Sequence, residues 1–508
     1  MHPIDWLVSQ VSPAAGLRRA HARSVLAELR SYEGAKLGRR TQGWHAPGGT
    51  ANDAIRGSLP RLVNRSRDVM RNTWWGPRIK STFVSHAVGS GITPTVKTGA
   101  KSASKDATRR AIRVWNDWAK ECDAEGQLDI NGLIALAAGT IIESGEVLIR
   151  RRPTGHTRGK VPLRLQLIEG DQLDTSRTGP LTDQGIDFAA DGGRSGYWLL
   201  PYNPGRMMMG MARGASARVP ANDVLHVYRK DRIGQARGVP WVAPVLLKGR
   251  DIADLEEAVI VKAKVEACLT VFVKRAAGST AHLAQTVTDP RAAAPAAGRR
   301  KLENLAPGMI NYLDQDEDIN AVTPSSSLAF DSVQVNNWMT LAAGAGITYD
   351  QLTGDLRQAN YSSLRAGKIE FRRLIEQFQW LTLTPMLLDK IWQWFVDAAQ
   401  DAGVLPRRAG GYPVEWIMPA VEPIDPLKDL QADILAVRSG RMTWSQFVAS
   451  WGVDPDDQLD EIERWLKDLD AREVVLDADP RRGAGGVKGA AKSDAKPQTD
   501  DEDLANAA

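Results

Sequence analysis

The amino-acid sequence predicts a mostly helical α+β protein, and three observations support this fold class. The chain has 508 residues, 43% of them hydrophobic and 25% charged, a composition typical of a globular protein with core enough for roughly two to four domains. Apolar residues recur at helical spacing along most of the chain. Between positions 144 and 228, by contrast, short alternating segments are separated by Gly, Pro and Asp, as strands are.

The N-terminal segment, residues 1–58, is expected to be a flexible basic arm. Seven basic residues lie between Arg18 and Arg40, and the Gly/Pro-rich stretch HAPGGTAND follows them. Its first residues have no basic stretch ahead of their apolar part, so they make a poor signal peptide. We therefore expect synthesis in the cytosol.

Residues 59–240 are predicted to form one α+β domain. Helical spacing indicates an amphipathic helix soon after residue 59, a second helix over 76–87, and two more between 107 and 142. The apolar stretch LIALAAGTII is too short to span a membrane and indicates a buried helix. The expected strands are EVLIRRR, PLRLQLIEGDQLD, GYWLLPYNP and DVLHVYRKD.

The stretch 241–273 has the longest uninterrupted helical pattern. A helix of that length needs a partner, either a companion helix or a neighbouring subunit, because its apolar stripe is narrow. Its cations alternate with acidic residues and could pair between neighbours; they are Lys248, Arg250, Lys262 and Lys264. Residues 274–326 are broken by Gly and Pro and include a plausible pair of strands in PGMINYLDQDEDINAV.

Helical character returns in the C-terminal part. A helix is expected within 327–348, then a polar loop over 349–361 in which Arg357 is the only cation, then a long basic helix whose start near Asn360 has residue types that cap helices. This helix and a following strand region make up 362–425. Helices with acidic or hydroxyl starts are predicted over 426–475, and a disordered tail over 476–508 with an acidic run at its end.

Signatures of chemistry are scarce. The formal net charge of +4 does not require a nucleic-acid partner, and the two cysteines, Cys122 and Cys268, favour neither a disulfide framework nor a metal site. The sequence has no GxxxxGK[ST] or HExxH motif, and its seven histidines are scattered. We expect no metal, no cofactor and no membrane span. The acidic sets at 314–318 and 454–457 are read as turn and helix-start residues rather than Mg²⁺ ligands.

Three other residues are read as structural. His226 alternates with apolar residues, as a core histidine in a strand does. Trp74 and Trp75 are expected to anchor a core or an interface rather than to stack on bases.

Six stretches taken together resemble the lambda-type family of phage portal proteins, colinearly over about 59–455. They are RSRDVMRN with SHAVGSGITP (65–94), WNDWAKECDAEGQLD (115–129), SGEVLIRRR (144–152), LQLIEGDQLD (165–174), DVLHVYRKDRIGQARGVPWVAPVLL (223–247) and ITYDQLTGDLRQANYSSLRAGKIEFRR (347–373). The resemblance implies a ring, usually a dodecamer, at one capsid vertex. Double-stranded DNA enters and leaves through its channel, and the ring has no enzymatic activity of its own.

The resemblance also implies domains and partners. The wing would be 59–240 and 362–425, the stem helices 241–273 and 327–348, the clip 274–326, the tunnel loop 349–361 and the crown 426–475. The implied partners are other copies of the chain, DNA, the large terminase subunit, the major capsid and scaffold proteins, and a head–tail adaptor. The chain would lie in the virion, after assembly in the host cytoplasm.

Eight residues are the candidate functional residues of this interpretation. Those expected to face DNA in the tunnel loop are Asp355, Arg357, Gln358 and Asn360. Those expected to carry stem charge toward a neighbour or the channel are Lys248, Arg250, Lys262 and Lys264. Two alternatives remain open from the residues: a metal-dependent nuclease or packaging ATPase assembled from distant carboxylates, and a capsid scaffold or adaptor that is not a portal.

Overall fold

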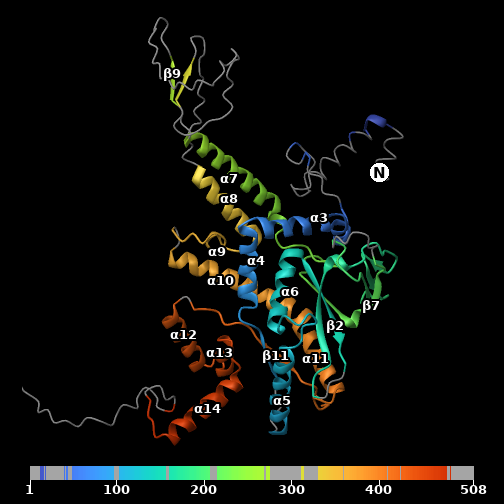
Figure 1. Cartoon of the computed structure of the whole chain (residues 1–508), viewed down its shortest axis with the longest axis vertical. Helices are drawn as coiled ribbons and strands as arrows, with labels where there is room; N and C mark the ends of the chain where they lie inside the picture. Colours follow the sequence, from blue (N-terminus) through green and yellow to red (C-terminus); the bar gives the residue numbers. More distant parts are fainter. Residues whose placement is uncertain are drawn as a thin grey trace, which may run out of the picture. The chain divides into compact units, whose positions relative to one another are not determined.

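A computed structural model describes ten stretches of the chain and a few isolated residues nearer its ends (Figure 1). The stretches are 48–96, 102–155, 159–205, 214–267, 271–274, 310–313, 330–357, 360–408, 410–423 and 425–476. The chain divides into two units, Met1–Ala54 and Ile55–Ala508. The predicted tail beyond Leu476, most of the arm and most of 274–326 lie outside the described residues, as do the acidic residues at 314–318.

The described elements are helical with several small sheets, which confirms the α+β fold class. The helices are α3 (Ala51–Asn72), α4 (Trp75–Ala87), α5 (Ser102–Ala119), α6 (Ile130–Ser144), α7 (Leu246–Ala267), α8 (Phe330–Ala345), α9 (Tyr349–Thr353), α10 (Tyr361–Phe378), α11 (Asp389–Asp401), α12 (Pro426–Arg438), α13 (Trp444–Ser450) and α14 (Pro455–Ala471). The strands are β1 (Thr93–Val96), β2 (Glu146–Pro153), β3 (Leu163–Glu169), β4 (Thr182–Asp183), β5 (Ile186–Phe188), β6 (Arg194–Leu199), β7 (Ala217–Pro220), β8 (Val224–Tyr228), β9 (Val271–Lys274), β10 (Ile310–Leu313) and β11 (Val414–Ile417).

Helical structure begins before residue 58, within the segment that was expected to be a flexible arm. Helix α3 begins at Ala51, and the Asp53 carboxylate at its start accepts hydrogen bonds from the backbone N–H and hydroxyl of Thr50, the latter at 2.6 Å. An acidic residue in the first turn also interacts favourably with the helix dipole. This cap explains why the chain becomes helical within the segment that composition alone assigned to the arm.

The main core surrounds α4 and α6. Helix α6 is apolar on nearly all sides, and most of its residues are buried, as LIALAAGTII predicts. It begins at the N-cap Asp129, whose side chain accepts from the N–H of Gly132, and ends at Gly145 with φ 91°. Trp75, Ile79 and Phe83 of α4 lie in the same core. The start of the α+β domain is therefore built as the sequence indicates.

Two sheets follow α6. Strands β3, β2 and β8 form an antiparallel sheet in that order, and β4, β5, β6 and β7 form a second sheet. Alternate residues of β2 serve different neighbours: Val147 and Ile149 join the main core, while Leu148 lies in a second cluster with Ile186 and Leu199 of the other sheet. The second sheet thus covers one face of β2 near its start.

Helices α7 and α8 lie side by side, so the long helix has its companion within the chain (Figure 1). The expected helix over 241–273 is shorter than predicted. A 3₁₀ turn at Ala243–Val245 precedes α7, which ends at Ala267, and Val271–Lys274 is strand β9, paired in parallel with β10. Pro244 accounts for the late start, and the β-branched and aromatic run VFVK favours a strand.

The helix after the polar loop is continuous from α10 to α11 but changes its winding in the middle. Residues Gln379–Leu388 form a π-helix that contains Pro385. Proline offers no backbone N–H to the helical ladder. Beside it, the hydroxyl of Thr384 donates to the carbonyl of Gln379 at 2.9 Å. The aromatic residues of α11 pack against α5 in a cluster made of Trp115, Trp118, Trp392, Phe395 and Trp416.

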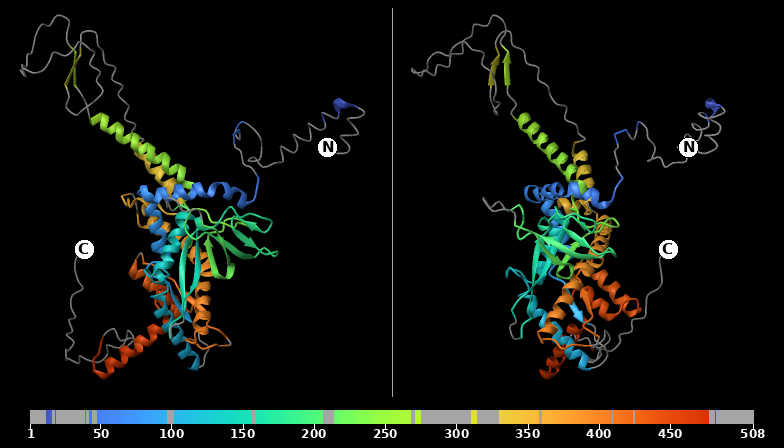
Figure 2. Two further views of the ribbon diagram at one scale, coloured as in Figure 1. Left: turned by 45° about the vertical axis from the view of Figure 1, so that its right-hand side comes forward. Right: turned by 90° about the vertical axis from the view of Figure 1, so that its right-hand side faces the viewer.

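The helices α12, α13 and α14 each start at the predicted type of cap, namely Asp425, Thr443 and Asp454. Few of their residues are buried. Figure 2 shows the three helices in two further views. Two ion pairs join them to other helices: Arg365 of α10 with Asp429 at 3.4 Å, and Arg109 of α5 with Asp460 at 2.7 Å. Within the described ranges, no helix is long and apolar enough to cross a membrane.

Candidate functional site

The loop between α9 and α10 contains the residues that the sequence singled out most strongly. Helix α9 starts at Thr348, which forms a reciprocal capping box with Gln351, and ends at Gly354 with φ 71°. A positive φ suits glycine because other residues suffer a steric clash there. The loop that follows is therefore anchored by a well-defined turn rather than by packing.

Asp355 and Arg357 of this loop pair with each other. The Asp355 carboxylate accepts from Nε of Arg357 at 2.9 Å, from its Nη2 at 2.8 Å and from its backbone N–H at 3.0 Å. These hydrogen bonds from Arg357 are the main reason that the pKa of Asp355 lies well below its usual range. The arginine side chain is 85% exposed, so its charge reaches solvent already accompanied by a carboxylate.

The last two loop candidates differ in what the structure says of them. Asn360 is the N-cap of α10: its Oδ1 accepts from the N–H of Ser363 at 2.8 Å, and Ser363 completes the box. The predicted helix start is thus confirmed, and the Asn360 side chain is engaged in holding α10. Gln358 lies outside the described residues.

The cations of α7 fall into two groups. Lys248 is half-buried and donates to Oδ1 of Asn337 on α8 at 2.8 Å, so it serves the packing of α7 against α8. Glu256 of the same helix accepts from Gln334 and Trp338 of α8. The predicted role of Lys248 between subunits therefore competes with this contact inside the chain.

The other three α7 cations make up the second group. Arg250 and Lys264 are exposed, and Lys262 is partly exposed. Their positions are compatible with contact to another molecule, which stays a prediction.

A buried ionic cluster, which the sequence did not predict, connects Glu146 at the start of β2 with His226 in β8 and with Arg237 in the segment after β8. Glu146 on β2 accepts from the Arg237 guanidinium, from the N–H of Gly238 at 2.8 Å, and from Nε2 of His226 at 2.9 Å. Arg237 also donates to the carbonyl of Gly170 at 3.1 Å. The side chains of Glu146, His226 and Arg237 are at most 4% exposed.

The hydrogen bonds of His226 define its protonation state. An Arg194 Nη1 donor lies 2.6 Å from Nδ1, so Nδ1 must accept, and Nε2 carries the proton that it donates to Glu146. Burial, followed by the charge of Arg194, lowers the pKa of His226 to about 4, although Glu146 favours the charged form. His226 is thus a satisfied core histidine, as its strand pattern predicts.

Glu146 stays ionised in this cluster. Burial by itself would raise its pKa, but the charge of Arg237 and the hydrogen bond from His226 outweigh burial, and the pKa lies well below its usual range. Arg194 brings in the second sheet, since it donates to the hydroxyls of Tyr197 and Tyr228. The cluster therefore joins both sheets to the segment that leads into α7.

The remaining candidates behave as structural residues. Trp75 is buried in the main core, and Trp74 packs against Trp338 of α8 with ring centroids 4.6 Å apart. Asp454 caps α14 by accepting from the N–H groups of Asp456 and Asp457. In the part of the chain that the structure describes, no group of three or more His, Cys, Asp or Glu side chains is placed to hold a metal ion.

A comparison with protein families decides the assignment. The model described as "Phage portal protein, lambda family" matches residues 37–379, two thirds of the sequence, including α3 to α10. The chain belongs to the lambda family of phage portal proteins. The match confirms the resemblance read from the sequence; it starts before the expected residue 59 and stops at the π-helix.

Individual relatives of this portal-family chain are distant. It is 24% identical over 463 residues to a "Probable portal protein" of Halomonas phage phiHAP-1, covering 88% of each chain. Among solved structures, it is similar to a chain in the virion of a native gene transfer agent particle, with 14% identity and a TM-score of 0.41, covering 82% of this chain and 98% of the other. A chain in the neck of an empty particle of that kind gives 16% identity and a TM-score of 0.38, with 77% and 94% covered.

Proposed function

We propose that this portal-family chain assembles as a closed ring, a dodecamer, at one capsid vertex, and that double-stranded DNA is packaged and ejected through its channel. Family membership is the observation that carries this proposal. A ring is a heterologous interface that closes on itself, so every subunit must present two different faces. The chain would assemble in the host cytoplasm and remain in the virion.

The parts of the ring follow the boundaries expected from the sequence. Helices α7 and α8 would form the stem, the loop between α9 and α10 the narrow point of the channel, and the helices of 426–475 the crown. The large terminase subunit would dock on 274–326, a head–tail adaptor at the same end, and major capsid and scaffold proteins at the periphery. We propose no chemistry for this chain, since a separate terminase would hydrolyse ATP.

The loop geometry suits a surface over which a polymer slides. Affinity for DNA rises with each phosphate that a protein cation neutralises, and a ring multiplies any cation by the number of subunits. Pairing of Arg357 with Asp355 leaves the loop little net charge. A channel lined by such pairs would contact DNA without holding it, and the exposed Leu356 between them adds an apolar contact that carries no charge.

The decisive experiment measures the assembly itself. Native mass spectrometry and negative-stain microscopy of the purified chain should show a ring with a central channel. A monomer, or an assembly without a channel, would instead favour a scaffold or adaptor. The same sample should show neither ATP hydrolysis nor Mg²⁺-dependent cutting of DNA, and either activity would restore the enzyme alternative.

A further inference from the structure

One face of β2 changes character along its length. Glu146, Leu148, Arg150 and Arg152 alternate on that face, because side chains of a strand point to opposite sides in turn. The buried cluster and the second sheet cover its beginning. Its end carries arginines only, and these are half-exposed or exposed.

The neighbouring strand adds a third arginine to the same face. In the register of β2 with β3, Arg152 is the direct partner of Arg164, and Arg150 is the partner of Gln166. Like charges placed directly opposite each other across two strands destabilise the pairing. Burial and the charge of Arg152 also lower the pKa of Arg150. The three residues Arg150, Arg152 and Arg164 are called the arginine cluster below.

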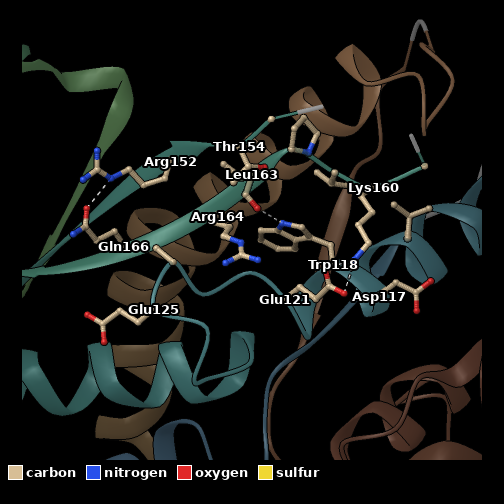
Figure 3. A pocket seen from close by; sticks show the side chains of 16 residues that line it. Asp117, Trp118, Glu121, Glu125, Arg152, Thr154, Lys160, Leu163, Arg164 and Gln166 are labelled. Atoms are coloured by element: carbon tan, nitrogen blue, oxygen red, sulfur yellow. Dashed lines mark hydrogen bonds and ion pairs between the residues drawn. The ribbon is translucent and has the colours of Figure 1, made fainter. Parts of the chain in front are cut away.

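Among the described residues, acidic charges compensate this cluster in part: Asp223 acts on Arg150, and Glu121 and Asp123 interact with Arg164. Arg152 donates to the uncharged amide oxygen of Gln166 at 2.8 Å, and Figure 3 shows Arg164 turned the other way, toward Trp118. No side-chain hydrogen bond or ion pair joins Arg164 to another described residue. Glu121, one of the acidic residues that interact with Arg164, already pairs with Lys160 at 2.6 Å.

The cluster borders a hollow of about 970 Å³ between α5 and β3 (Figure 3). Arg152, Arg164 and Gln166 line one side, and Val114, Trp118, Val161 and Pro162 supply apolar surface. A hollow of this size takes several amino-acid side chains. Arginine forks bind carboxylates with two parallel hydrogen bonds, so the arrangement suits an anionic group carried on a peptide.

The acidic rim argues against nucleic acid. Asp117, Glu121 and Glu125 also line the hollow. They would repel a phosphate backbone, which carries charge at every nucleotide. A short peptide can place its carboxylates on the arginines alone and its uncharged residues along the rim.

This chain contains a suitable peptide. Asp500, Asp501, Glu502 and Asp503 follow one another near its C-terminal end, and Leu504 comes directly after them. Residues 477–499 can span up to roughly 80 Å when extended, so reach is not limiting. Helix α14, from which this segment leaves, is ion-paired through Asp460 to α5, the helix that lines the hollow.

We propose that the acidic run Asp500–Asp503 binds the arginine cluster, in the same chain or in an adjacent copy, and so straps the helices of 426–475 to the β2–β3 sheet. Charge complementarity selects the site, and the strap adds a link to helices whose described contacts with α5 and α10 include the ion pairs Arg109–Asp460 and Arg365–Asp429. Within one chain, this contact does not require ring formation.

The test uses fluorescence anisotropy with a labelled peptide of residues 497–508. A chain ending at Lys496 should bind it at least about tenfold more tightly than the full chain, whose own acidic run occupies the site. Binding should weaken as salt rises, because exposed charges are screened. The matched probe replaces the acidic run by Asp500→Asn, Asp501→Asn, Glu502→Gln and Asp503→Asn, and it should bind neither chain.

Variants of the shortened chain locate the site. The double change Arg152→Ala and Arg164→Ala should weaken peptide binding by roughly tenfold or more, as expected for lost charge-assisted hydrogen bonds. Arg373→Ala, which removes an exposed arginine of α10, should leave binding unchanged. Circular dichroism confirms that the variants fold. Equal binding by the full and shortened chains, equal binding of the neutral probe, or unchanged binding by the double variant would each overturn the proposal.

Discussion

Nε2 of His226 lies 2.9 Å from a carboxylate oxygen of Glu146, and both side chains are almost wholly excluded from solvent. The histidine donates this proton while its other nitrogen accepts from Arg194. Protonation would place a second donor against the Arg194 guanidinium and add a buried charge. The hydrogen bond from Arg194 to His226 therefore holds only while His226 is neutral, which makes the joint between the two sheets sensitive to acid.

We predict that the chain loses stability as pH falls from about 6.5 to 4. The pKa of His226 is lowered to about 4 in the folded state, so between these values the unfolded chain binds more protons than the folded chain. The loss should reach up to roughly 3 kcal/mol, and Glu146, whose folded pKa is also lowered, adds to it below about pH 4.5. Urea midpoints measured across this range test it. His226→Gln keeps a donor toward Glu146 and should flatten the profile; an unchanged slope would contradict the assignment.

Removing Arg237 should be among the most destabilising single changes. Arg237→Met leaves the Glu146 carboxylate buried without its main counter-charge, which typically costs about 3 to 5 kcal/mol. The comparison is Arg407→Ala, since Arg407 pairs with Asp401 at the surface and exposed pairs contribute about 1 kcal/mol or less. Chemical denaturation of both variants gives the difference. Similar losses would mean that the buried pair contributes no more than a surface pair.

The sequence predicted the helices and strands better than it predicted the buried cluster of Glu146, His226 and Arg237. Caps such as Asp129 and Thr443 are local signals, and the helices that they start were expected in place. Glu146 and Arg237, however, stand 91 positions apart, and neither lies in a pattern that distinguishes a buried ion from a surface one. The available signal was weak: a glutamate directly after the helix-ending Gly145, at the start of an apolar strand.

In the loop between α9 and α10, too, the sequence predicted the local features but not the contacts between side chains. That Asn360 begins a helix follows from residue type and the apolar spacing after it. Arg357, the cation expected to meet DNA, is exposed in this loop, and its contact with DNA stays a prediction. Residue types alone did not predict the geometry of the loop. Asp355 was expected to oppose the charge of Arg357, whereas the three hydrogen bonds between these residues depend on the turn at Gly354.

The packing of α7 on α4 gives a third prediction. Gly249 of α7 lies directly against the indole of Trp75, where an added Cβ would collide with the ring. Trp75 is buried in the main core and cannot move away cheaply. Gly249→Ala should therefore destabilise the chain by about 1 to 3 kcal/mol despite favouring helix formation. Gly57→Ala in α3, where no atom lies near the added Cβ, should not destabilise it in the same thermal melt.

The final prediction concerns the loop between α9 and α10, proposed above as the narrow point of the channel, and separates the charge of this loop from its fold. Replacing Asp355 by Asn removes the counter-charge of Arg357, so each subunit of a ring gains one net positive charge facing solvent. Binding of DNA should strengthen, and the slope of log affinity against log salt should steepen by about 0.9 for each phosphate newly contacted. Filter binding at several salt concentrations measures both quantities, and packaging of DNA should slow because the polymer is held more firmly.

Control variants of this loop must leave the N-cap of α10 at Asn360 intact. Adding Arg357→Ala to Asp355→Asn should return the salt slope to that of the unaltered ring, because the released cation is then absent. The single change Arg357→Ala should keep ring assembly and impair DNA packaging or retention, and Gln358→Ala extends the same test. Asn360→Ala would also cost about 0.5 to 2 kcal/mol of helix stability, so Asn360→Asp, which preserves the cap, is the appropriate change at that position. If rings fail to form when only Arg357 is replaced, the loop is an element of assembly and not of the channel surface.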